Sequence, residues 1–241
     1  MSSRRARTAF LAGGAGTLCL FLGVLWLAWR HEPSYYREAL ALDAADLARG
    51  SDELLAHAGT LASDAQRHGH WRALFTAAQV NGWLATDVPR NHPTLLPPEL
   101  CEPRVAIDHG GVWLAGRWGT GRAAPICSLR LDVRVLEPNT LAVRIRRMRA
   151  GLFPLPMQSL LDGISRAAAN HGVHLAWKQT GGDPVAVLRL PSLGTSAASL
   201  EIEQLQLAAG EIFVAGKTSR AAPPPLVADQ RDAGTNENRQ R

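Results

Sequence analysis

The chain has 241 residues and a formal net charge of +5 at pH 7, an excess that invites comparison with nucleic-acid-binding proteins. The excess is unevenly spread, because residues 1–29 carry three arginines and no acidic residue, whereas residues 30–218 carry nineteen basic and eighteen acidic residues. A domain with almost no net charge lacks the excess of cations that binds a nucleic-acid phosphate backbone, so we expect no nucleic acid partner.

An uncharged stretch of twenty-two residues, 8–29, follows the three N-terminal arginines. About 20 apolar residues cross the hydrocarbon core of a membrane, and flanking arginines stay on the cytoplasmic side. The pattern predicts a cytoplasmic N-terminus over residues 1–7, a transmembrane anchor over residues 8–29, and an extracytoplasmic remainder at a bacterial inner membrane. A cleaved signal peptide and a lipoprotein signal at Cys19 are the alternatives. Trp26 and Trp29 stand where a peptidase requires small side chains, which favours the anchor.

Residues 30–70 are predicted to be helical, either as a stalk or as helices that pack on the domain. Leucines recur every seven residues, at Leu40, Leu47, Leu54 and Leu61. This spacing allows a coiled-coil partner, but the companion positions make a poor seam, which favours packing on the chain's own domain. The stretch Gly50–Glu53 predicts a break in the helix, with Ser51 as the cap of a second helix.

An α+β domain is expected over residues 71–218. A strand at 71–75 precedes a capping box, Thr76 and Gln79, which opens a short helix. A proline-rich extended loop covers residues 87–100. Alternating apolar and polar residues then predict four strands joined by short turns, at residues 103–108, 112–118, 126–136 and 141–146.

The turn between the last two of these strands decides which side chains face the core. Apolar residues occupy odd positions on both strands, so the numbers of paired residues must add to an even sum. A three-residue loop at 137–139, with Asn139 in the left-handed region, satisfies this condition and places Asp132 opposite Arg144.

The C-terminal half continues with a helix and four more strands. The helix is predicted from Met157 to Asn170, with strands at residues 173–178, 185–190, 199–207 and 211–217. Residues 219–241 are polar and are expected to be disordered. The fold class is therefore α+β: an N-terminal transmembrane helix, then helices and a curved antiparallel meander sheet packed on a helix.

Few residue patterns suggest catalysis or metal binding. Two pairs of closely spaced histidines, His68 with His70 and His171 with His174, lack the spacing of a zinc site. No phosphate loop or nucleophile motif is present either, so we expect no metal, no cofactor and no catalytic residue. Cys101 lies just before one predicted strand and Cys127 at the start of another, and the two are predicted either to form a disulfide or to remain buried thiols.

Two groups of side chains are candidates for binding. An arginine cluster on the predicted solvent face comprises Arg144, Arg146, Arg147 and Arg149. Arginine is an ordinary residue on such a face, but in a domain tethered to a bilayer it can also contact anionic lipid head groups. On the opposite face, apolar side chains are expected to line a groove for a lipid, namely Val133, Val143, Leu160, Leu161 and Ile164.

The anchor, the segment Phe75–Leu84, the segment Arg149–Pro156 and the closing strands from Leu200 to Gly216 together resemble the YpmS-like group of bacterial single-pass membrane proteins. The resemblance covers about residues 75–218 and implies a membrane-anchored extracytoplasmic domain with no catalytic residue to carry over. The layout is also similar to tubular lipid-binding folds, in which a curved antiparallel sheet wraps a helix around an apolar groove.

The expected function is that of a membrane-anchored, non-enzymatic domain that binds a lipid or another apolar ligand in the groove. The alternative is a scaffold or interaction module of a cell-envelope complex, which would dock a protein partner on helix 34–68 or on an exposed strand edge. An envelope enzyme ranks behind both. A lipid carrier requires a continuous apolar cavity, whereas a scaffold packs the same side chains solid.

Overall fold

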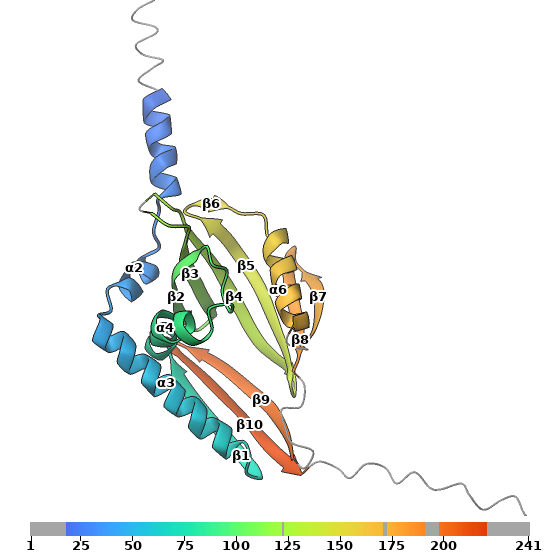
Figure 1. Cartoon of the computed structure of the whole chain (residues 1–241). Helices are drawn as coiled ribbons and strands as arrows, with labels where there is room; N and C mark the ends of the chain where they lie inside the picture. The colour runs from blue at the N-terminus through green and yellow to red at the C-terminus, as the bar shows by residue number, and fades with distance from the viewer. Residues whose placement is uncertain (1–17, 122, 171–172, 191–197, 221–241) are drawn as a thin grey trace, which may run out of the picture.

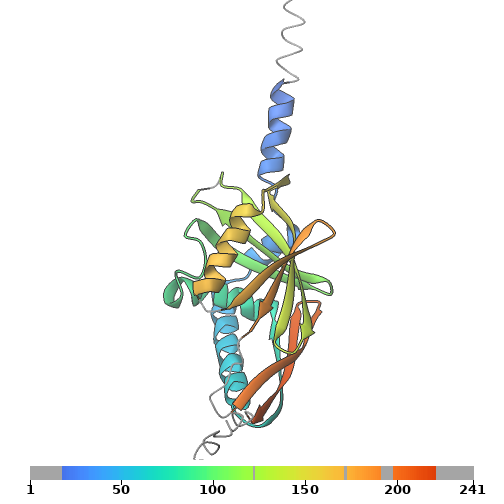
Figure 2. The ribbon, with the colours of Figure 1, turned by 90° about the vertical axis from the view of Figure 1, so that its right-hand side faces the viewer.

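The structure, a computed structural model, describes residues 18–121, 123–170, 173–190 and 198–220. The fold is α+β and contains a large and a small antiparallel sheet with several helices (Figure 1). The helix at residues 18–29 stands at one end of the molecule, and the smaller sheet lies at the opposite end (Figure 1 and Figure 2). The domain therefore has one end next to the N-terminal helix and one end far from it.

The predicted anchor falls only partly within the described residues. Residues 18–29 are helical, and most of their apolar side chains are exposed. No helix in the described part of the chain combines the length and the apolar character needed to span a membrane. Residues 1–17 and the predicted tail from residue 221 onward lie outside the described residues.

Two helices follow, α2 (Ser34–Leu40) and α3 (Ala44–Asp64), and the break between them lies at residues 41–43. Asp43 caps α3, because its carboxylate accepts a hydrogen bond of 2.7 Å from the backbone N–H of Asp46. The heptad leucines of α3 are half-buried in a helix that packs against the rest of the domain, namely Leu47, Leu54 and Leu61. The helix therefore packs on the chain's own domain, which is the alternative that the poor coiled-coil seam favoured.

The predicted helix break at Gly50–Glu53 is wrong. Gly50 and Ser51 are buried inside the continuous helix α3, where they face the helix α4 (Ala77–Thr86). A Cβ atom on Gly50 would lie only 2.8 Å from the carbonyl oxygen of Ala78, so the two helices cross at very close range. Packing against α4 thus keeps residues 50–53 helical, although their sequence carries a signal for the start of a new helix.

The capping box at the start of α4 is confirmed. The strand β1 (Gly69–Thr76) leads into it. The backbone N–H of Gln79 donates to Thr76 Oγ1 at 3.2 Å, and the backbone N–H of Thr76 donates to Gln79 Oε1 at 3.0 Å. The loop after α4, predicted to be extended, contains the short helix α5 (Val88–Asn91).

The larger sheet has seven strands. They are β2 (Leu100–Asp108), β3 (Gly111–Trp118), β4 (Ile126–Glu137), β5 (Thr140–Ala150), β6 (Phe153–Pro154), β7 (His174–Thr180) and β8 (Asp183–Arg189). Their order is β2-β3-β4-β5-β8-β7, with β6 paired to the end of β5. The predicted meander is confirmed for β2 to β5, after which β8 rather than β7 lies next to β5.

The smaller sheet brings together the two ends of the described domain. Its order is β1-β10-β9, with β9 (Ala198–Ala208) and β10 (Glu211–Arg220) forming a hairpin. β1 pairs along its whole length with β10, so strands more than a hundred residues apart in the sequence are neighbours. β10 also runs two residues past the predicted domain boundary at residue 218.

The hairpin between β4 and β5 has the predicted register, but the predicted three-residue loop at residues 137–139 is wrong. Asp132 is opposite Arg144, as predicted. Glu137 pairs with Thr140, which leaves a two-residue turn, and a bulge just before Glu137 restores the even sum. Asn139 has a φ of 59°, in the left-handed region, as expected.

α6 (Gln158–Asn170) lies over β7 at one edge of the larger sheet (Figure 2). The indole N–H of Trp177 on β7 donates to Ser165 Oγ on α6 at 2.8 Å. The two buried core clusters lie elsewhere, near α2 and near α4. They contain Tyr36, Ala115 and Ile126 in the first, and Leu84, Val88 and Val105 in the second.

Candidate functional site

A row of four side chains crosses β4, β5, β8 and β7 on one face of the larger sheet. Val133 pairs with Val143, Val143 with Ala186, and Ala186 with Trp177. Directly paired residues point to the same face of a sheet, so all four share the face on which Trp177 bonds to α6. We call this the inner face; it is formed by Leu131, Val133, Val135, Leu141, Val143, Ile145, Leu175, Trp177, Ala186 and Leu188.

α6 covers one side of the inner face and leaves the other uncovered. It packs chiefly against β7. β4 lies three strands away, so at about 4.8 Å per strand Val133 is about 14 Å from the covered strand. Val133, Val143, Leu161 and Ile164 are all half-buried. The predicted groove residues on the sheet thus share one face, while the side chain of Leu160 lies outside the described residues.

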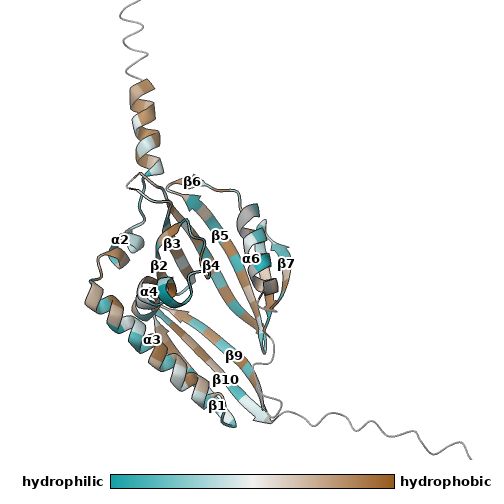
Figure 3. Cartoon of the chain, viewed as in Figure 1, coloured by the Kyte–Doolittle hydropathy of each residue, from teal (hydrophilic) through white to brown (hydrophobic). Residues whose placement is uncertain are grey.

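The middle of the inner face belongs to neither core cluster. Ile145 and Ala186 are buried there, at 1% and 3% exposure. The side chains around them on β4 and β5 are only half-buried, namely Leu131, Val133, Val135, Leu141 and Val143. Figure 3 shows these two strands with apolar and polar residues in alternation. An apolar floor that its own helix leaves uncovered can hold an apolar ligand or pack against a second protein.

The opposite face of the same strands, the outer face, carries the charged residues. Arg144 Nη2 lies 2.7 Å from Asp183 Oδ2, and the same nitrogen donates to the carbonyl oxygen of Thr180 at 2.8 Å. Arg146 Nε lies 2.9 Å from Asp132 Oδ2 and 3.6 Å from Asp183 Oδ2. Arg144 and Arg146 are thus both ion-paired to acidic groups on this face.

The ion pairs continue along the outer face toward β3. Arg130 lies 3.1 Å from Asp132 and 3.5 Å from Asp108, and its guanidinium stacks over the Trp113 ring at 5.0 Å. Partial burial of Asp108 would raise its pKa, but the hydrogen bonds that it accepts from Trp113 and from the backbone, together with Arg130, lower it on balance. The charges of the outer face therefore form one network that joins residues of four strands, β8, β5, β4 and β2.

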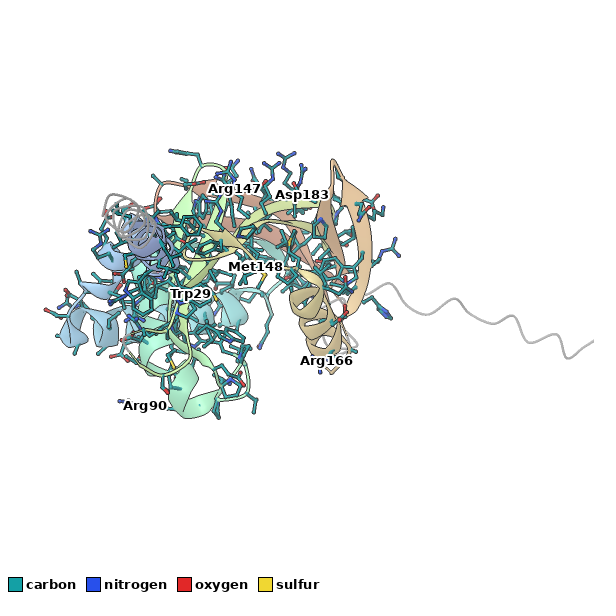
Figure 4. The ribbon with its side chains drawn as sticks, turned by 90° about the horizontal axis from the view of Figure 1, so that it is seen from above. Trp29, Arg90, Arg147, Met148, Arg166 and Asp183 are labelled. Atoms are coloured by element: carbon teal, nitrogen blue, oxygen red, sulfur yellow. The ribbon has the colours of Figure 1, made fainter. Side chains whose placement is uncertain are left out.

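Arg147 and Arg149 lie nearer to the N-terminal helix than the other two arginines do. A bulge in β5 inserts Arg147, which has a φ of 52°. Both side chains are exposed and make no ion pair within the described part of the chain. Seen from above, Arg147 and Asp183 lie on the same side of the molecule (Figure 4). The four arginines that the sequence groups together thus form two pairs in different settings.

The turn after β5 is in direct contact with the end of the N-terminal helix. The backbone N–H of Leu152 donates to the carbonyl oxygen of Ala28 at 2.9 Å, and the rings of Trp29 and Phe153 are 6.3 Å apart. Gly151, with a φ of 58°, fits against the backbone of Ala28 and Trp29, where a Cβ atom would collide. These contacts determine how the domain is oriented relative to the helix.

The two cysteines of the domain are free thiols. Cys101 pairs with Arg117 and Cys127 with Gly116, so they lie on either side of β3. Successive residues of a strand point to opposite faces, which places the thiols on opposite faces and their Cα atoms about 10 Å apart, too far for a disulfide. Burial raises the pKa of the Cys127 thiol. Of the two predicted alternatives, the structure has the separate thiols.

The remaining polar candidates have structural partners. Lys217 Nζ lies 2.9 Å from Glu203 and 3.2 Å from Glu201, and its hydrogen bonds to Glu203 and Glu201 raise the pKa of Lys217. Within the described residues, no three His, Cys, Asp or Glu side chains are grouped in a way that would hold a metal ion. His171 lies outside those residues.

Sequence reasoning missed two of the residues that surround the arginines on the outer face, Lys178 and Asp183. Lys178 and Asp183 come close to β5 because β8 lies between β5 and β7. No local pattern indicates this strand order. The one available signal was an acidic residue, Asp183, directly after a Gly-Gly turn, where an arginine of a neighbouring strand can pair with it.

The chain matches no protein-family model, no curated protein and no solved structure among those with which it was compared. The resemblance to the YpmS-like group therefore stays a prediction.

Proposed function

We propose that this chain is a single-pass membrane protein whose extracytoplasmic domain binds a lipid or another apolar ligand on its inner face, without catalysing a reaction. One observation carries the proposal: around the buried Ile145 and Ala186, apolar side chains of β4 and β5 on the inner face stay partly exposed, and α6 packs chiefly against β7. In this proposal the sheet is the floor of a groove and α6 is one wall. Residues 8–29 form the anchor in the inner membrane.

Burial of an acyl chain would stabilise such a surface. Each methylene group moved from water to an apolar surface contributes about 0.8 kcal/mol, so a chain laid along the half-buried residues of β4 and β5 gains several kcal/mol. Binding by fixed polar contacts is not required for this gain. A ligand held mainly by apolar surface fits the inner face, because none of the residues that form it is charged.

The end of the domain next to the N-terminal helix supports the membrane part of the proposal. Leu152 is 48% exposed beside the end of that helix, and Arg147 and Arg149 are exposed on the same end of β5. Apolar and aromatic groups settle at the boundary of a bilayer, and arginines attract anionic head groups. We assign head-group contact to Arg147 and Arg149, and not to the ion-paired Arg144 and Arg146.

Photocrosslinking tests the apolar site. The full chain would be reconstituted in nanodiscs that contain a phospholipid with a diazirine on its acyl chain, irradiated, and digested for mass spectrometry. We expect adducts on β4 and β5 of the inner face. Val143→Asn places a polar amide in the floor, which we expect to reduce those adducts roughly tenfold, since burying an unpaired amide costs about 1–3 kcal/mol.

The matched control is Ala142→Asn, one position along β5 and on the outer face. This variant should leave the adducts unchanged. Adducts confined to residues 8–29, or an equal loss in both variants, would show that the inner face holds no lipid.

A scaffold function is the second candidate, and the edge of the larger sheet favours it. β7 is the last strand in the order, and within the described residues its outer edge pairs with no strand. Such an edge can accept a strand from another protein. Crosslinking in the native membrane that joins β7 to a second protein, with no lipid on the inner face, would support this candidate over the first.

A further inference from the structure

A cavity of about 290 Å³ lies on the outer face, on the side of the sheet opposite the proposed apolar site. Side chains from β4, β5, β7 and β8 line it, and the polar ones are Asp132, Arg134, Arg144, Arg146, Lys178 and Thr180. Its floor is apolar and includes Val185, which is only 9% exposed. The cavity is thus a shallow pocket with a closed floor and a charged rim.

The charges around this cavity do not cancel. The lining carries four cations, and two carboxylates face them, Asp132 in the lining and Asp183 beside it, which leaves a net charge of four minus two, or +2. Arg144 and Arg146 use those carboxylates. Arg134 and Lys178 have no acidic partner among the described residues, so the excess belongs to them.

The two carboxylates also hold the paired arginines in place. Asp183 contacts both Arg144 and Arg146, while Asp132 contacts Arg146 from β4. Guanidinium groups that are already oriented lose little entropy when they bind an anion, and they can donate hydrogen bonds to two oxygens at once. The cavity therefore combines two positioned donors with two uncompensated cations.

We infer that this cavity binds a phosphate dianion carried by a water-soluble phosphate ester. A phosphate monoester has a charge of about −1.5 to −2 at pH 7, which matches the excess of +2. Arg134 and Lys178 would neutralise it, Arg144 and Arg146 would direct N–H groups at its oxygens, and the Thr180 hydroxyl would donate a further hydrogen bond. The apolar floor at Val185 would contact the organic part of the ester.

Position along β5 indicates that the ligand comes from solution and not from the bilayer. Gly151 touches the N-terminal helix, and Arg144 lies seven residues before it on β5. At about 3.4 Å per residue Arg144 is roughly 20 Å from that contact, and Arg134 and its partner Ala142 are farther still. A phosphate in the head group of an anchoring membrane does not reach this distance.

Calorimetric titration of the full chain in phosphatidylcholine nanodiscs tests the inference, with phenyl phosphate as the probe at low ionic strength. We expect saturable binding with one site per chain, weakened by added salt. Removing both uncompensated cations in the double variant Arg134→Gln and Lys178→Gln should lower the affinity roughly tenfold or more, because hydrogen bonds to charged groups are the strong ones.

The matched control removes two exposed arginines elsewhere, in the double variant Arg90→Gln and Arg166→Gln. Figure 4 shows both residues on the side of the molecule away from Asp183. The control should bind phenyl phosphate like the unchanged chain. Equal weakening in both double variants would reduce the effect to general electrostatic attraction and overturn the site.

Two further measurements decide between a soluble phosphate ester and a lipid head group, and allow for a variant that does not fold. Nanodiscs that contain phosphatidic acid supply the same phosphate monoester from the bilayer. If they occupy the site while phenyl phosphate does not bind, the ligand is a lipid head group and the inference is wrong.

If circular dichroism shows that the double variant at Arg134 and Lys178 is unfolded, the single variant Lys178→Gln replaces it, with an expected loss of affinity of several-fold. No saturable binding to the unchanged chain also overturns the inference, and neither result depends on the apolar site.

Discussion

Asn139 connects the two sheets through its backbone and its side chain. Its backbone N–H donates to the carbonyl oxygen of Ile202 at 3.1 Å, and its carbonyl oxygen accepts from the N–H of Leu190 at 2.9 Å. Its side-chain amide donates to the carbonyl oxygen of Leu200 at 2.8 Å and accepts from the N–H of Ile202 at 2.8 Å. One turn residue in the left-handed region thus positions β9 below the β4–β5 hairpin.

Replacing Asn139 with alanine should destabilise the fold. The change removes two hydrogen bonds, leaves two backbone groups of β9 without a partner, and puts a Cβ-bearing residue without a polar side chain at positive φ. We expect the free energy of unfolding to fall by about 2–4 kcal/mol, measured by urea denaturation.

Asn139→Gly separates the two causes. Glycine removes the strain of positive φ but not the missing bonds, so we expect it to recover about 1 kcal/mol of the loss. An unfolding free energy for Asn139→Gly equal to that of the unchanged chain would show that the side-chain amide does not hold the sheets together.

At the scale of elements, the crossing of α3 and α4 depends on two glycines. Gly50 on α3 lies against the backbone of Ala78, and Gly82 on α4 lies against the backbone of Leu47 and Ser51. Helix axes approach this closely only where no Cβ intervenes. The capping box of α4 and the close crossing together place α4 over β2, where the second core cluster forms.

Gly82→Ala should force the two helices apart, because its Cβ atom would collide with the carbonyl oxygen of Leu47. Backbone atoms cannot rotate away as a side chain can, so we expect a loss of about 1–3 kcal/mol in the free energy of unfolding.

The control is Gly59→Ala on the exposed part of α3, where a Cβ atom meets nothing within 4 Å. This control should raise stability by up to about 1 kcal/mol through helix propensity. Equal effects of the two changes would contradict the close crossing.

At the scale of the whole molecule, one sheet separates two chemically different faces. Cross-strand pairing aligns apolar side chains on the inner face and charged side chains on the outer face. The sheet also extends away from the N-terminal helix, so its end beside that helix carries Arg147 and Arg149 while the cationic cavity lies farther along. The two proposed sites therefore occupy separate surfaces and can be tested independently.

The chain's two tyrosines report on the unfolding of the whole domain at high pH. Burial raises the pKa of Tyr35 and of Tyr36 from the ordinary 10.0 to about 12. The folded state therefore holds both phenolic protons more tightly than the unfolded state. The associated stability is complete below pH 10 and is lost as the pH rises through about 12.

We expect the tyrosinate absorbance of the folded chain to rise near pH 12, together with the loss of the circular dichroism signal, whereas the chain in urea should titrate near pH 10. Tyr35→Phe should halve the absorbance change and keep its midpoint. Titration of both phenols near pH 10 with the fold intact would contradict their burial.

Local patterns in the sequence predicted the elements that depend on neighbours along the chain. The alternation on β4 and β5 determined their register and the pairing of Asp132 with Arg144, and Thr76 with Gln79 determined the start of α4. Each of these rests on residues within a few positions or within one hairpin, where the pleat or the helical repeat decides which side chains meet.

Only the tertiary structure decided what depends on contacts between distant segments. The pairing of β1 with β10 and the insertion of β8 beside β5 follow from packing across long loops, and this insertion brings Asp183 and Lys178 to Arg144 and Arg134. The same kind of contact kept α3 continuous through Gly50, against its capping signal. Hydrophobic patterning by itself specifies which face of a strand is buried, but it does not specify which distant strand lies beside it, because many partners satisfy the same pattern.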